Sequence, residues 1–194
     1  MSNQNNEIEI FYPTSIASWR KWLEENHQTK QSVWVVFYSK KSEKKTITWS
    51  ESVDVALCFG WIDSKKVKID PDSSHQFFSR RKATSTWSKI NKQKVEQLIG
   101  SGLMTDAGYK CIEIAKQNGS WFILDDVEEL IIPDDLAAEF EAKPTAKIFY
   151  ESLSKTVKKG ILQWIVLAKT TETRQKRITE IVTRAEQNLK PKHL

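Results

Sequence analysis

Residues 56–66 read ALCFGWIDSKK, and the change of pattern inside this stretch decides the fold of the first half of the chain. From about Glu51 to residue 59, apolar residues recur at helical spacing, and Gly60 stands where a left-handed residue would end a helix. The residues after Gly60 alternate between apolar and polar side chains, which is typical of a strand. We therefore expect a helix, a sharp stop and a strand, with Asp63 near the beginning of that strand.

Two further strands are predicted around this one. VWVVFYSKK, residues 33–41, is a run of β-branched and aromatic residues, which favours a buried strand. HQFFSRRK, residues 75–82, can return along residues 61–70 after the turn sequence PDSS. Apolar spacing and capping residues predict helices from Ser15 to residue 26, from Ser50, from Ser85 or Thr86 to residue 99, and from Thr105 to Gly119.

The end of the chain has a purely helical pattern. Pro133 and Pro144 are each placed to begin a short helix, and Ser154 and Thr170 or Thr171 can cap two longer ones. The helix after Ser154 carries its apolar stripe at Val157, Ile161, Trp164, Ile165 and Ala168. The sequence thus predicts an α+β fold, in which a small antiparallel sheet with packed helices is followed by a C-terminal helical unit. We expect a flexible tail at residues 1–14, an α+β domain at 15–130 and a helical unit at 131–194.

Composition limits the class of protein. The 194 residues carry a net charge of +5, with a basic stretch at residues 61–99 and an acidic connector at 120–141. The start of the chain lacks a secretory signal pattern, and no run approaches the ~18 apolar residues of a membrane span. We therefore expect a cytoplasmic protein without membrane insertion. Cys58 and Cys111 are predicted to be buried free thiols, and the scattered histidines suggest neither a metal site nor a cofactor.

The predicted hairpin gathers charged and aromatic side chains. If residues 71–74 form its loop, Asp63 lies opposite Lys82 and Lys65 lies opposite Arg80, on the same face as Trp61. Arg81 then points to the other face. The start of the next predicted helix, from Ser85, adds free N–H groups that favour an anion. The candidate anion-binding residues are Trp61, Asp63, Lys65, Arg80, Arg81, Lys82, Ser85, Trp87 and Ser88.

Other interpretations of these residues stay open. The arginines and Asp63 can form a purely structural set of ion pairs above two core tryptophans. An enzyme acting on an anionic small molecule would use Asp63 as its acid or base, but the chain has no P-loop, nucleophile elbow or dinucleotide fingerprint. Weak nucleic-acid binding is a second alternative, because basic and aromatic residues are mixed in this stretch. A nucleic-acid partner is nevertheless not expected, because no RNA-binding or zinc-finger signature accompanies them.

Several longer motifs indicate a family. ALCFGWIDS, RRKATSTWSKINK, GLMTDAGYKCIEIAKQNGSW, IPDDLAAEF and WIVLAKTTETRQKRI resemble the YdeI/OmpD-associated (OmdA-like, bacteriocin-protection) family, in order over roughly residues 15–187. The resemblance implies a link to resistance against bacteriocins or antimicrobial peptides, and it implies no catalytic residues. We therefore expect a ligand- or partner-binding protein in a stress-resistance setting rather than an enzyme. Its partner would be an anionic small molecule or another protein.

Overall fold

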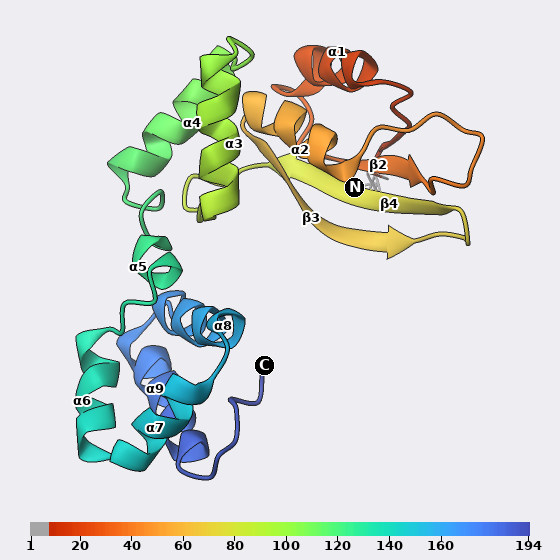
Figure 1. The fold of residues 1–194 in the computed structure, drawn as a ribbon. Helices are drawn as coiled ribbons and strands as arrows, with labels where there is room; N and C mark the ends of the chain where they lie inside the picture. The colour runs from red at the N-terminus through yellow and green to blue at the C-terminus, as the bar shows by residue number, and fades with distance from the viewer. Residues whose placement is uncertain (1–7) are drawn as a thin grey trace, which may run out of the picture. The chain divides into compact units, whose positions relative to one another are not determined.

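The computed structural model describes residues 8–194 and divides the chain into two compact units (Figure 1). The first unit ends at Trp121 and the second begins at Phe122. The first combines a sheet with helices and the second is helical, which confirms the predicted α+β class. Among residues 8–194, no helix is both long enough and apolar enough to cross a membrane.

The first unit is built on a four-stranded sheet with the order β1-β2-β4-β3. Its strands are β1 (Ile10–Phe11), β2 (Ser32–Tyr38), β3 (Trp61–Lys68) and β4 (Ser73–Arg80). The three strands predicted from sequence run antiparallel, whereas β1 pairs with β2 in parallel. β1 falls within the stretch expected to be a tail. It is held in place because the Trp34 N–H donates to the Glu9 carbonyl and the Phe11 ring stacks on Trp19.

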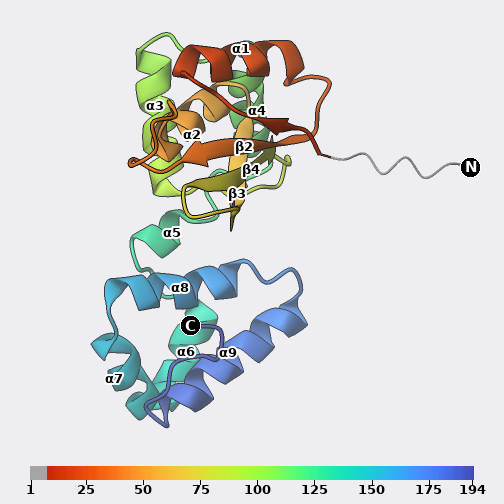
Figure 2. The same cartoon turned by 90° about the vertical axis from the view of Figure 1, so that its right-hand side faces the viewer.

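Four helices complete the first unit: α1 (Ile16–Asn26), α2 (Trp49–Cys58), α3 (Lys89–Gly100) and α4 (Asp106–Gln117). Figure 2 shows α1 and α2 on one side of the sheet. Ser15 caps α1 as predicted. The predicted cap of α2 at Ser50 is wrong, because Thr48 and Glu51 form a reciprocal capping box two residues earlier. Helix α3, in contrast, begins later than predicted, and Ser88 caps it.

Aromatic side chains fill the core between the sheet and these helices. Trp19, Trp61, Trp87 and Phe78 are fully or almost fully buried, and Trp22 contacts both Trp19 and Trp61. The indole N–H of Trp19 donates to the Ser52 carbonyl at 3.0 Å, which satisfies its polar atom inside the core. Much of the chain's high tryptophan content is therefore structural. Ile16 at the start of α1 and Ile90 at the start of α3 lie outside this core and are 44% and 63% exposed.

The predicted register of the hairpin is wrong by four residues. Trp61, rather than Lys65, lies opposite Arg80, and Asp63 lies opposite Phe78 instead of Lys82. The Asp70 carboxylate accepts from the N–H groups of Asp72 and Ser73, which sets the turn earlier than expected. An irregularity between Asp63 and Lys66 then shifts the pairing again, so that Lys66 lies opposite Gln76.

This shift places Lys65 on the other face of the sheet. Its amino group lies 5.2 Å from the ring centroid of Trp34 and 5.5 Å from that of Phe77. A one-residue slip reverses the face of every side chain beyond it. Lys65 therefore does not join Trp61 and Asp63, and the predicted grouping of these three residues is wrong.

The second unit contains α5 (Asp125–Glu128), α6 (Asp134–Ala142), α7 (Pro144–Ser152), α8 (Lys155–Val166) and α9 (Thr171–Ala185). Pro144 is the first residue of α7 as predicted, whereas Pro133 precedes α6 as its N-cap. Ser154 and Thr170 cap α8 and α9. Ile161 and Ile165 of the predicted stripe are buried, but Trp164 is only half-buried, against His193 and Arg177.

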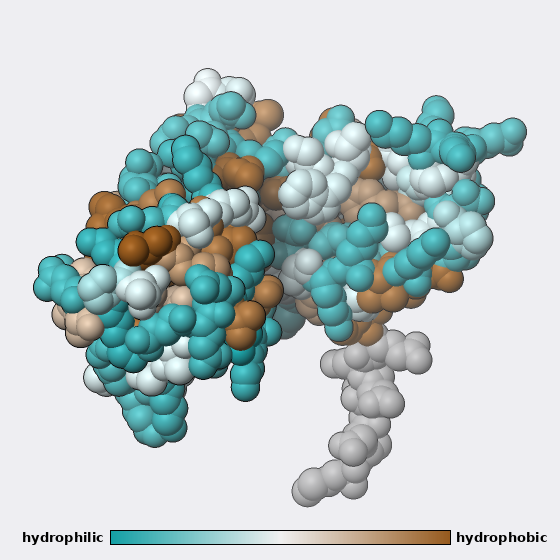
Figure 3. All heavy atoms as spheres, turned by 60° about the horizontal axis from the view of Figure 1, so that its bottom comes forward, coloured by the Kyte–Doolittle hydropathy of each residue, from teal (hydrophilic) through white to brown (hydrophobic). Residues whose placement is uncertain are grey.

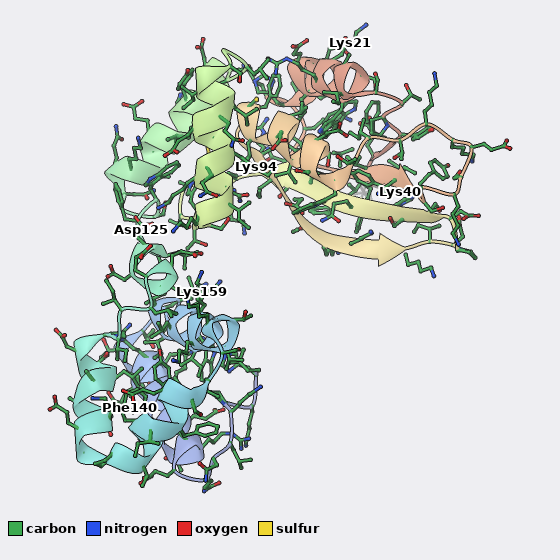
Figure 4. All side chains as sticks on the ribbon, in the orientation of Figure 1. Lys21, Lys40, Lys94, Asp125, Phe140 and Lys159 are labelled. Atoms are coloured by element: carbon green, nitrogen blue, oxygen red, sulfur yellow. The ribbon has the colours of Figure 1, made fainter. Side chains whose placement is uncertain are left out.

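Ion pairs tie the helices of the second unit together. Arg174 of α9 binds the Asp135 carboxylate with two nitrogens, and Lys159 of α8 binds Glu128 of α5. Phe140 and Lys159 are labelled in Figure 4, in the interior and on the surface of this unit. The visible surface in Figure 3 is mostly hydrophilic, with hydrophobic residues in small groups.

The charge is unequal between the units. Residues 8–121 contain 18 Lys or Arg and 12 Asp or Glu, a net charge of +6. Residues 122–194 contain 12 of each, a net charge of zero. The basic excess of the chain therefore lies in the unit that contains the sheet.

Candidate functional site: a cavity lined by two arginines

A cavity of about 850 Å³ opens in the first unit, where five of its elements end or begin. We call it the arginine cavity. It is lined by residues that follow α1, by the stretch from the end of α2 into β3, by the end of β4 and by the first turns of α4. Its residues are His27, Gln28, Phe59, Gly60, Trp61, Arg80, Arg81, Ala83, Thr105, Asp106, Ala107, Lys110, Cys111 and Ile114.

Gly60 makes this convergence possible. Its φ of +70° turns the chain from α2 directly into β3, and a left-handed residue of this kind is strained unless it is glycine. The Gly60 carbonyl then accepts from the Arg81 N–H at 2.9 Å, which holds the end of β4 beside the same turn. The prediction of a left-handed stop at Gly60 is confirmed.

Helix α4 sits directly on the end of α2. The backbone N–H and the hydroxyl of Thr105 both donate to the Cys58 carbonyl, at 3.2 and 2.6 Å. A Cβ atom on Gly108 would lie only 2.4 Å from this carbonyl oxygen. The absence of a side chain at residue 108 is therefore required for α4 to form a wall of the cavity.

The two consecutive arginines both reach the cavity. Within a strand they would point to opposite faces, but β4 ends at Arg80 and the alternation ends with it. The predicted opposite placement of Arg81 is therefore not observed. The Arg81 guanidinium donates to the Thr86 carbonyl at 2.6 Å and lies over the Trp87 ring. Burial lowers the pKa of Arg81 to about 10.

Four buried side-chain nitrogen donors on residues that line the cavity lack a hydrogen-bond acceptor. They belong to three residues, namely Nε1 of Trp61, Nε and Nη2 of Arg80, and Nε of Arg81. Among the described residues, the only other buried side-chain polar atom without a partner is the Tyr150 hydroxyl. Native proteins leave few such groups, and each calls for an acceptor. All four of these nitrogen donors belong to residues that line the arginine cavity.

The start of α4 adds to this preference for anions. Thr105 is the N-cap residue, but its hydroxyl is bonded to Cys58 and does not cap the free N–H groups of the first turn. Helix N-termini with free N–H groups attract anions. Lys110 adds a positive charge to the lining, and Asp106 adds its one carboxylate.

Asp63 lies outside this cavity. Its carboxylate accepts from the Trp49 indole N–H at 2.8 Å and from the Gln76 amide at 3.0 Å. Trp49 is the first residue of α2 and Gln76 is a buried residue of β4, so Asp63 joins a helix to the sheet. These contacts give Asp63 a structural role.

The remaining predicted site residues are divided between several places. Trp87 is buried beneath Arg81, and Ser88 caps α3 by accepting from the Asn91 N–H. Ser85 and the exposed Lys82 belong to the turn between β4 and α3, where the Ser85 N–H donates to the Lys82 carbonyl. The structure therefore brings together Trp61, Arg80 and Arg81 of the predicted set.

Sequence reasoning missed the cavity residues supplied by other elements. His27 follows α1, and Lys110 and Cys111 lie one turn into α4. The helix start at Thr105 was a visible signal, but the approach of α4 to Gly60 is a tertiary contact. Both cysteines are free, with Cys58 buried and Cys111 half-buried, and burial raises the pKa of each thiol.

A second hollow of about 770 Å³ lies at the other end of the sheet, beside Trp49 and the segment that follows β2. Its lysines Lys40, Lys66 and Lys68 are exposed, and none of the buried unpartnered atoms of residues 8–194 belongs to its lining. Residues 8–194 contain no group of three or more His, Cys, Asp or Glu residues that could hold a metal ion. The arginine cavity is thus the stronger candidate site.

The fold and this cavity define a two-unit protein whose α+β unit carries a cationic cavity. The chain belongs to the family described as Domain of unknown function (DUF8412), whose model matches residues 11–111, more than half of its length. Residues 129–188 match the family model described as Bacteriocin-protection, YdeI or OmpD-Associated. This second match confirms the predicted resemblance to the YdeI/OmpD-associated family for the second unit. Most of the motifs from the first unit that suggested this resemblance lie within the DUF8412 match instead. Neither the curated proteins nor the solved structures contain a match to the chain.

Proposed function

We propose that this chain is a cytosolic, non-catalytic protein of the YdeI/OmpD-associated type that binds an anionic small molecule in the arginine cavity. The observation that carries the proposal is the set of four buried N–H donors without acceptors, on Trp61, Arg80 and Arg81. Leaving such groups unpaired costs free energy, and a bound anion would recover it. A link to bacteriocin protection is part of the proposal, and it is supported by the family match at residues 129–188.

A binding role is favoured over catalysis by the position of Asp63, the acid or base expected from the sequence. Asp63 is engaged by Trp49 and Gln76 and does not line the cavity. A general acid or base must come within hydrogen-bond reach of its substrate. The start of β3 and the end of β4 supply indole and guanidinium N–H donors to the lining, and such donors bind and orient anions.

Thermal unfolding with and without anions tests the proposal. Sulfate, phosphate and benzoate are added to the wild-type chain at concentrations up to a hundredfold above the measured Kd. A ligand that binds only the folded state should then add about 2.7 kcal/mol to the free energy of unfolding. Arg80→Met should abolish this protection. It should not lower the stability of the ligand-free protein, because the buried guanidinium has two N–H groups without acceptors.

Arg174→Met is the matched control, because Arg174 is also partly buried but its guanidinium is paired with Asp135. This change should destabilise the second unit and leave anion protection intact. An Arg80→Met protein that is markedly less stable without ligand, together with no protection of the wild type by any anion, would contradict the proposal. Arg80 would then serve the scaffold alone.

A further inference from the structure

The unpartnered donors at the end of β4 restrict the kind of anion that fits. All four are N–H groups, so only acceptor atoms can satisfy them. They come from Trp61 on β3, from Arg80 on β4 and from Arg81 just beyond it. A carboxylate offers two oxygens in one plane, whereas a phosphate group offers three terminal oxygens that point in different directions. Donors supplied by three residues, on two strands and the turn beyond them, are matched better by the three oxygens of a phosphate group than by two oxygens in one plane.

The charge of the lining gives a second restriction. Arg80, Arg81 and Lys110 carry positive charge, and Asp106 carries the one negative charge among the lining residues. These four residues give the lining a net charge of +2, with His27 counted as neutral, and a dianion neutralises this charge. The Nδ1 atom of His27 lies 2.8 Å from the Leu23 carbonyl oxygen. Because a carbonyl oxygen only accepts, Nδ1 is the donor of this hydrogen bond. A phosphate monoester carries close to two negative charges at pH 7, whereas a carboxylate or a sulfate ester carries one.

The size and the apolar part of the lining give a third restriction. A volume of about 850 Å³ is far larger than one phosphate group and lies in the range of sites for small organic ligands. Phe59, Ala83, Ala107 and Ile114 contribute apolar surface to the same cavity. An inorganic ion would leave this surface in contact with water. The cavity therefore suits a ligand with an anionic end and an apolar part.

We infer that the arginine cavity binds a phosphate monoester whose organic part is small and largely apolar. This inference rests on the proposed anion-binding function and specifies its ligand class. The phosphate group accepts from the donors of Trp61, Arg80 and Arg81. The organic part lies against Phe59 and the apolar residues of α4.

Isothermal titration of the full chain with four probes tests the inference. Phenyl phosphate has the phosphate group and an apolar part, inorganic phosphate lacks the apolar part, phenyl sulfate carries one charge fewer, and benzoate is planar. Phenyl phosphate should bind at least tenfold more tightly than each of the other three. Lys110→Gln removes one positive charge and should reduce the ratio between phenyl phosphate and phenyl sulfate to about threefold or less.

Two further variants separate ligand contacts from changes in folding. Trp61→Phe keeps an aromatic ring but removes the indole donor, so it should weaken phenyl phosphate and phenyl sulfate alike. Arg174→Met, in the second unit, should leave all four affinities at their wild-type values. The ratio of the affinities for two ligands, measured on the same folded protein, does not change when a substitution lowers only the stability of the fold.

Each alternative result has a distinct meaning. Equal affinities for the four probes, all lost in Arg80→Met, would overturn the ligand class and leave the proposed anion site standing. Equal affinities for phenyl phosphate and inorganic phosphate would overturn the organic part of the inference. Binding of none of the probes would overturn the inference and the proposed function together.

Discussion

The guanidinium of Arg81 lies over the ring of Trp87, with 3.7 Å between its central carbon and the ring centroid. The same group donates to the Thr86 carbonyl, so one arginine fixes the segment between β4 and α3. Trp87 is almost fully buried, and its other ring contact is with Trp121. The buried Trp87 ring thus supports the Arg81 guanidinium from one side. This support is what a guanidinium needs in order to present its N–H groups in a defined direction.

Arg81→Lys should lower the free energy of unfolding by roughly 1–3 kcal/mol, because an ammonium group reproduces neither the stacking nor the fixed donor geometry. Urea denaturation measures this change. Arg80→Lys is the matched substitution, since two of the Arg80 guanidinium N–H groups have no acceptor to lose, and its effect should be near zero. A loss near zero for Arg81→Lys would show that the contacts of Arg81 do not matter for stability.

Gly108→Ala should destabilise the first unit and weaken anion binding. The new Cβ would lie 2.3 Å from the Met104 sulfur and 2.4 Å from the Cys58 carbonyl oxygen, so α4 must move away from α2. Overpacking of this kind costs about 1–3 kcal/mol. Gly100→Ala is the control, because a Cβ there meets nothing within 4 Å, and its melting temperature should not fall. Similar behaviour of the two variants would mean that α4 shifts without cost.

In the second unit, Phe140→Ala should cost about 3–5 kcal/mol, since Phe140 is 1% exposed and its ring packs on Tyr150. Trp164→Ala should cost clearly less, because Trp164 is half-buried near the end of α8. Chemical denaturation followed by circular dichroism compares the two. A larger loss for Trp164→Ala would place the centre of this core on α8 instead of between α6 and α7.

Burial raises the pKa of Tyr150 to about 12, and its hydroxyl has no hydrogen-bond partner. The folded state therefore keeps this proton while the unfolded chain, with a pKa near ~10, loses it. The contribution of Tyr150 is constant below about pH 10 and falls as pH rises from there to about 12, by roughly 2–3 kcal/mol.

Tyr150→Phe isolates this effect. At pH 8 the variant should be as stable as the wild type or slightly more stable, because it removes an unpaired hydroxyl. At pH 11 the difference in favour of the variant should be larger. Urea denaturation at the two pH values measures both quantities, and a difference that does not change with pH would show that the hydroxyl reaches solvent.

Features determined by neighbouring residues were predictable from sequence. Ser15, Ser154 and Thr170 cap helices as expected, since a cap depends only on the residues within one turn of it. The stop at Gly60 was equally local. The match of residues 129–188 bears out the resemblance for the second unit.

The candidate site depended on features that no local pattern contains. The register of β3 and β4 depends on the turn held by Asp70 and on one irregularity after Asp63, and both were invisible in the alternation of side chains. Lys65 changed face for this reason. The approach of α4 to Gly60, which adds Lys110 and Cys111, joins segments about 50 residues apart in the chain.

The confinement of the net charge to one unit has a kinetic consequence. Residues 8–121 carry +6 and residues 122–194 are neutral, so the long-range field that an anion meets originates in the unit that contains the arginine cavity. Such a field speeds diffusional encounter with ligands of opposite charge, and dissolved salt screens it over about 10 Å at 0.1 M. Raising the ionic strength should therefore slow the capture of an anion more than it hastens its escape.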